Sequence, residues 1–176
     1  LVQPKIVGYA IGLRYKYGQL VNAYSRKKTK LIENIRTIKT IPLSIDDSLK
    51  VEVELEGVLY SPIFKSKLLN DQFISSSNQI NETNTNLSFL AFKIFSSNSD
   101  ELSDLTQLQN WGFEVPITLR TDDPNQVKTW HSQWINKELF SNFPTNGIVA
   151  KCNSYSTKSF LGDKQSSPNW ALALTR

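Results

Sequence analysis

Alternation of apolar and polar side chains predicts β-strands in the first third of the chain. The stretch 9–25 alternates on both sides of Gly18, a residue suited to a tight turn, and predicts a β-hairpin. In the stretch 51–61 apolar side chains alternate with three glutamates, which predicts a strand with one solvent-exposed face. The first residues of the chain also predict a strand.

Three later stretches add strands, and three others add helices. Residues 87–95 predict a buried strand, and the chain closes with predicted strands at 147–153 and 169–175. The stretch 100–113 spaces four apolar residues three apart, which predicts an amphipathic helix: Leu102, Leu105, Leu108 and Trp111, with Gly112 at the end. The predicted helix at 122–140 has a capping Asp123, followed by Pro124, and an apolar face of Val127, Trp130 and Trp134. A short helix is predicted to begin at Pro62. This order predicts an α+β fold whose sheets are mainly antiparallel.

Composition and polar stretches indicate one domain over residues 1–176. The chain has 39% hydrophobic residues and shows no internal repeat and no apolar run long enough to span a membrane. The Asn- and Ser-rich stretch 75–86 predicts a polar surface loop, as does 96–103. Because it begins as a strand and lacks methionine, the chain is expected to be a piece of a larger protein.

The chain carries few metal-binding or redox-active side chains. One cysteine, Cys152, and one histidine, His131, cannot form a disulfide framework or a structural zinc site, so we predict no zinc and name no metal-ligating residue. This composition is compatible with the cytoplasm, the location we predict. A net charge of +4 permits a nucleic-acid or nucleotide partner but does not require one.

Several short motifs follow one another along the chain. In order they are "KIVG" (5–8), "LRYKYGQLVNAYSR" (13–26), "IENIRTIKTIPLSI" (32–45), "VEVELEGVLYSP" (51–62), "GIVAKCN" (147–153) and "SSPNWALAL" (166–174). Together they resemble the adenylation (nucleotidyltransferase) domain of NAD-dependent DNA ligases, in one colinear order over nearly the whole chain. The resemblance implies the nucleotidyltransferase fold, related to ATP-grasp proteins, and a role in DNA replication and repair.

The resemblance also implies a chemistry and the residues for it. In that family a lysine attacks the α-phosphate of NAD, with magnesium, and passes AMP to a DNA 5′-phosphate. Lys5 falls on this lysine. The nucleotide contacts fall on Gln3 for the adenine amino group, Arg26 in the nucleotide loop, Phe92 for stacking on adenine, and Lys151 for the phosphates.

Each of these residues also has a plainer interpretation. Lys5 and Lys151 fit solvated strand lysines, and Phe92 fits core packing. Arg26 belongs to a basic cluster that is either a solvated charge run or a patch for the DNA backbone.

This chain lacks the negative charge that the family pattern has at four acidic positions. Gln3, Val7, Val58 and Asn146 stand where the family has carboxylates, and Thr175 stands where it has a last lysine. A valine neither binds a metal nor accepts a proton. The resemblance therefore implies NAD and magnesium as cofactors, with binding that these substitutions make weak or absent.

Three functions follow. The first is a catalytically impaired, ligase-like domain with a binding or interaction role toward DNA or a protein partner, with nucleotide contact and no membrane contact. The second is an active divergent ligase domain that transfers AMP from NAD to Lys5 and on to a DNA 5′-phosphate. The third is a structural module whose pocket is closed by Val7 and Val58. The nicotinamide-recognising module is expected to be missing, because it precedes the lysine in the family.

Overall fold

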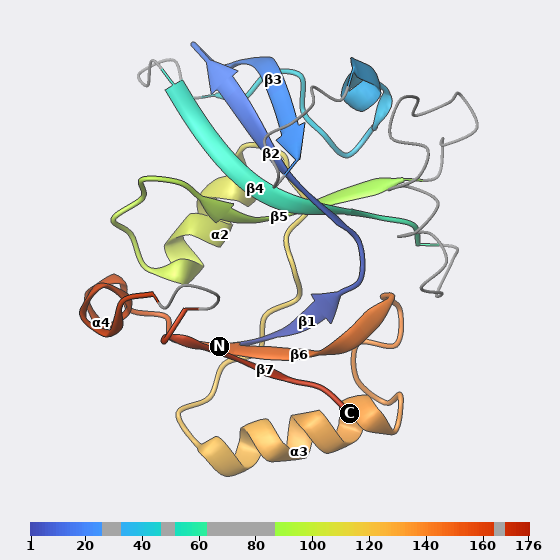
Figure 1. Cartoon of the computed structure of the whole chain (residues 1–176), viewed down its shortest axis with the longest axis vertical. Coiled ribbons are helices and arrows are strands. Elements are labelled where there is room, and N and C mark those ends of the chain that lie inside the picture. The colour runs from blue at the N-terminus through green and yellow to red at the C-terminus, as the bar shows by residue number, and fades with distance from the viewer. Residues whose placement is uncertain (26–32, 47–51, 63–86, 164–167) are drawn as a thin grey trace.

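Two antiparallel sheets stacked one above the other form the framework of the chain (Figure 1). This computed structural model describes residues 1–25, 33–46, 52–62, 87–163 and 168–176. The four-stranded sheet has the order β3-β2-β4-β5, with β2 (Tyr9–Lys16), β3 (Gln19–Ser25), β4 (Glu52–Tyr60) and β5 (Ser88–Ile94). The three-stranded sheet has the order β1-β6-β7, with β1 (Val2–Ile6), β6 (Thr145–Lys151) and β7 (Ala171–Leu174). The predicted α+β fold with mainly antiparallel sheets is confirmed.

The predicted hairpin at 9–25 is confirmed as β2 and β3. Tyr17 and Gly18 connect the two strands, with φ angles of 48° and 75°. Two successive residues in the left-handed region form the turn whose twist matches that of the paired strands. A Cβ on Gly18 would also lie 2.6 Å from the Ile45 carbonyl oxygen, so the turn favours glycine for space as well as for φ.

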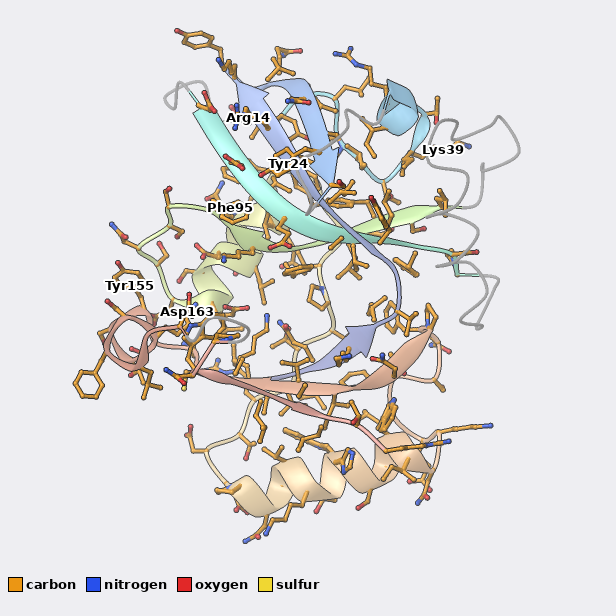
Figure 2. All side chains as sticks on the ribbon, viewed as in Figure 1. Arg14, Tyr24, Lys39, Phe95, Tyr155 and Asp163 are labelled. Carbon is orange, nitrogen blue, oxygen red and sulfur yellow. The ribbon has the colours of Figure 1, made fainter. Side chains whose placement is uncertain are left out.

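One face of the four-stranded sheet is polar, as the glutamates of 51–61 predicted. Arg14 on β2 lies 3.1 Å from a carboxylate oxygen of Glu52 and 3.5 Å from one of Glu54, and the Tyr24 hydroxyl donates to Glu54. Figure 2 shows the labelled Arg14 and Tyr24 on these neighbouring strands. These partly exposed contacts cover the sheet without forming a core.

The opposite face carries the main core and α2 (Glu101–Asn110). Leu105, Leu108 and Trp111 are at most 4% exposed and pack in the same cluster as the strand residues Leu13, Leu55 and Phe89. The predicted helix therefore exists and buries the predicted face. It ends where Gly112 takes a φ of 88°.

The three-stranded sheet packs on α3 (Pro124–Ile135), which lies beneath it in Figure 1. The side chain of Asp123 accepts a hydrogen bond from the Asn125 amide, confirming the predicted cap. Trp134 is buried, and Val127 and Trp130 pack against the same cluster, which confirms the predicted apolar face.

A third cluster, which we call the inter-sheet cluster, contains Val58, Tyr60 and Leu90, with Ile6, Phe92 and Phe143 against it.

Two short elements were not predicted: the 3₁₀ helix η1 (Glu33–Thr37) and the helix α4 (Tyr155–Leu161). The short helix predicted to begin at Pro62 and the predicted loop at 75–86 lie outside the described residues, Pro62 excepted. No helix of the described part of the chain is long and apolar enough to cross a membrane.

Candidate functional site

Lys5 lies on β1, beside the start of β6. Backbone pairing places Pro4 opposite Ile148 and Ile6 opposite Thr145, so the register shifts by one residue at Lys5. The Lys5 ammonium donates a hydrogen bond of 2.8 Å to the Asn146 side-chain oxygen. These two residues, 141 positions apart in this chain, are thus brought together, with an amide as the partner of the amine.

Gln3 lies two residues earlier on the same strand and is 2% exposed. Its side-chain nitrogen donates to the Thr118 hydroxyl over 3.0 Å. Burial of an amide is favourable only when such partners are present, so this contact fixes the orientation of Gln3.

Phe92 lies on β5 and packs against the inter-sheet cluster. Its ring also lies 5.8 Å from the Lys151 ammonium, within the range of a cation–π contact. Val58, for which the resemblance implied a carboxylate, is 8% exposed in the same cluster. Phe92 therefore combines core packing with a position next to a cation.

Lys151, at the end of β6, does not lie on the surface as a solvated strand lysine would. Its ammonium is 2.7 Å from one carboxylate oxygen of Glu101, and Lys158 of α4 is 2.9 Å from the other oxygen. The three side chains are only 13%, 8% and 14% exposed in the order Lys151, Glu101 and Lys158. We call this group the Glu101 triad.

For two further residues, Arg26 and Thr175, the structure gives little or no information about the side chain. Arg26 lies outside the described residues. Thr175 follows β7, and its carbonyl oxygen accepts from the His131 ring nitrogen over 3.2 Å. The Arg176 guanidinium donates to the Ile135 carbonyl and lies over the Trp134 ring, 5.7 Å from its centroid.

A family profile described as "NAD-dependent DNA ligase adenylation domain" matches residues 1–88 and 77–175. The chain belongs to this family. Among its relatives, the DNA ligase of Prochlorococcus marinus (strain NATL2A) is 31% identical, with 99% of this chain and 30% of the relative covered. The DNA ligases of Pseudothermotoga lettingae and Shewanella frigidimarina are 27% and 26% identical over 98% and 97% of this chain. The chain spans about 30% of the length of these relatives.

The described residues of this adenylation domain do not fit the magnesium ion that the family implies. Mg²⁺ is bound through oxygen ligands, of which carboxylates are the principal protein contribution. Beside Lys5 the side-chain oxygen belongs to Asn146, and the Glu101 carboxylate already holds two ammonium groups. No group of three His, Cys, Asp or Glu residues comes together within the described ranges.

The fit to an adenine nucleotide is partial. Phe92 and Lys151 are close enough to serve one ligand, with a ring for the base and a cation for a phosphate. Lys151 is already engaged by Glu101, however, and a ligand would have to compete with that carboxylate. Phe92 and Lys151 therefore lie side by side, and Glu101 neutralises part of the positive charge there.

Sequence reasoning missed two residues of this site, Glu101 and Lys158. Glu101 is the first residue of α2, where an acidic side chain is common and favourable toward the helix dipole, so its sequence position suggests nothing unusual. Lys158 lies on the unpredicted α4. No local signal indicates that they meet.

The pKa of the Glu101 carboxyl lies below its ordinary value of 4.5. Burial alone would raise the pKa, but the charge of Lys151 and hydrogen bonds from Lys151 and Lys158 together outweigh it and lower the pKa. A carboxyl with a lowered folded-state pKa stabilises the fold above its unfolded pKa, and this contribution is lost as pH falls through the folded pKa.

We therefore expect the free energy of unfolding to fall more steeply with acid in the unaltered chain than in Glu101→Gln. Urea denaturation at several pH values between about 6 and 3 measures this. Parallel slopes for the two proteins would contradict a charged Glu101 that stabilises the fold.

Proposed function

We propose that this chain is a ligase-type adenylation domain that retains the fold, does not transfer AMP, and serves a binding role toward DNA or a protein partner. The observation that carries the proposal is the Lys5–Asn146 hydrogen bond of 2.8 Å. The nucleophilic lysine of this chemistry must lose a proton, and its phosphoryl centre needs charge neutralisation by a metal or by cations.

The described side chains near Lys5 supply neither requirement. Asn146 accepts a hydrogen bond but carries no charge and takes up no proton. Val7, two residues after Lys5, uses its backbone amide to donate to the Pro144 carbonyl over 2.7 Å, and its side chain is apolar. Within the described part of the chain, the neighbours of Lys5 thus offer no group that would activate it, which supports the proposal.

A second candidate is the divergent active domain. It is favoured by two lysines that the family motifs imply, Lys5 beside β6 and Lys151 beside Phe92. In that case Lys5 accepts AMP despite its amide neighbour.

Intact mass spectrometry separates the two candidates. After incubation with NAD, and separately with ATP, each with magnesium or manganese, we expect no increase corresponding to one AMP. The DNA ligase of Prochlorococcus marinus, treated in parallel, shows that the assay detects an adduct. Should an adduct form on this chain, disappear in Lys5→Ala and persist in Lys16→Ala, the non-catalytic proposal is wrong.

The partner and the location belong to the same proposal. Support for a DNA-related role comes from the relatives, which are named DNA ligases, and from the net charge of +4. A cytoplasmic location in a replication or repair setting follows from the same relationship. If the domain is a purely structural module instead, it will bind no DNA at low salt, where phosphate contacts are strongest.

A further inference from the structure

The Glu101 triad places one carboxylate between two ammonium groups. Each oxygen of Glu101 accepts from a different lysine, Oε1 from Lys151 and Oε2 from Lys158, at 2.7 and 2.9 Å. Two lysines and one glutamate leave the triad with a net charge of +1. Buried charges are stable only when paired, so the pair of lysines requires an anion at this place.

Each ammonium group of the triad also lies near an aromatic ring. Lys151 is 5.8 Å from the centroid of Phe92, and Lys158 is 5.2 Å from that of Trp170. Two cations with flat apolar surfaces beside them are suited to an anion attached to a ring, such as a nucleoside phosphate. Carboxylate and phosphate offer the same feature to the lysines, a pair of charged oxygens.

The backbone around Glu101 holds its carboxylate in this position. The Glu101 amide donates to the Asn153 carbonyl over 2.9 Å, and the Leu102 amide donates to the Asn153 side chain over 3.0 Å. The Asp100 side chain accepts from the Tyr155 amide over 2.8 Å. These bonds tie the start of α2 to the residues after β6 and to the start of α4. They therefore hold Glu101 close to Lys151 on β6 and to Lys158 on α4.

We propose that Lys151 and Lys158 form an anion site for a phosphate-bearing ligand, and that Glu101 is its internal occupant and excludes that ligand. Glu101 is thus the residue that decides whether this site accepts phosphate. The inference rests on the proposed non-catalytic function and adds a reason for weak nucleotide contact that is independent of Lys5. The family resemblance pointed only to Lys151, whereas Glu101 and Lys158 come from the contacts themselves.

The test compares binding of inorganic phosphate, AMP and adenosine by isothermal titration calorimetry, in EDTA and at matched ionic strength. Glu101→Gln removes the competing charge and keeps the side-chain size. We expect it to bind AMP about ten- to a hundredfold more tightly than the unaltered chain, the gain of a charge-assisted contact. Adenosine is expected to bind both proteins equally, and Glu138→Gln, an exposed control that removes the same charge, is expected to change nothing.

A second variant controls for loss of the fold as the cause of any change in binding. Glu101→Gln combined with Lys158→Gln has the same net charge as the unaltered chain, and its circular dichroism is expected to match. Its affinity for AMP should fall between those of the unaltered chain and the single variant, because only Lys151 is released.

Two results overturn the inference. One is a folded Glu101→Gln variant with the AMP affinity of the unaltered chain. The other is AMP binding by the unaltered chain that weakens in Lys158→Gln, because Glu101 would then not exclude the ligand.

The comparison of ligands shows which part of AMP is bound. Phosphate binding as tight as AMP binding identifies the anion alone as the ligand, and tighter AMP binding adds a ring contact. Phosphate, AMP and adenosine carry no leaving group that Lys5 could displace, so these titrations form no AMP adduct and are separate from the mass measurement on Lys5.

Discussion

Glu101→Ala is expected to lower the free energy of unfolding by about 3–5 kcal/mol, the usual cost of removing one partner from a buried ion pair. The change would leave Lys151 and Lys158 together with no counter-ion, at 13% and 14% exposure. Urea denaturation near neutral pH, followed by tryptophan fluorescence, measures the loss.

The matched control for Glu101 is Glu52→Ala. Glu52 also pairs with two cations, Arg14 and Lys16, but its side chain is 40% exposed. Water and salt screen such a pair, so we expect a loss of about 0–1 kcal/mol. Equal losses for the two variants would mean that the triad contributes no more than a surface pair. In Lys158→Ala the further effect of Glu101→Ala should be smaller, because fewer charges are then left unpaired.

Phe89→Ala is expected to lower the free energy of unfolding by about 3–5 kcal/mol. Phe89 is 0% exposed on β5, and its ring centroid lies 6.0 Å from that of Phe113. Gly57 on the neighbouring strand leaves room for this ring, since a Cβ there would lie 2.3 Å from the Phe89 Cζ atom. Removing the ring therefore leaves a cavity between β4, β5 and the residues after α2.

Phe160→Ala is the control for this second prediction. Phe160 on α4 is 89% exposed, so the same substitution removes little buried area, and we expect a change within about 0.5 kcal/mol. Thermal and urea denaturation of both variants test the difference. A loss at Phe89 no larger than at Phe160 would mean that the space beside Gly57 collapses without cost.

The fold was predictable where local patterns determine it. The hairpin needs only alternation and Gly18, and α3 needs Asp123 with an apolar face, so both were predicted. The 3₁₀ helix has no such signal, and α4 has a capping serine but no apolar face. Helix α4 has no buried residue, and its start depends on Ser154, which accepts from the Thr157 amide, and on contacts with α2.

The candidate site was predictable only in part. The family motifs indicated Lys5, Gln3 and Lys151, because motif order is preserved along the chain. The Glu101 contacts join residues 50 and 57 positions apart, and nothing in one stretch of sequence specifies pairing at that distance. Which cation a carboxylate meets is decided by the packing of α2, β6 and α4 on one another.

The pairing of β1 with β6 has a consequence for the order in which the chain folds. The hairpin of β2 and β3 closes a two-residue turn, whereas β1 pairs with a strand about 140 residues later. Closing a longer loop costs more chain entropy, and contacts distant in sequence slow folding. We expect the four-stranded sheet to assemble first and the three-stranded sheet last. During synthesis on a ribosome, Lys5 could form its hydrogen bond with Asn146 only after most of the chain has emerged.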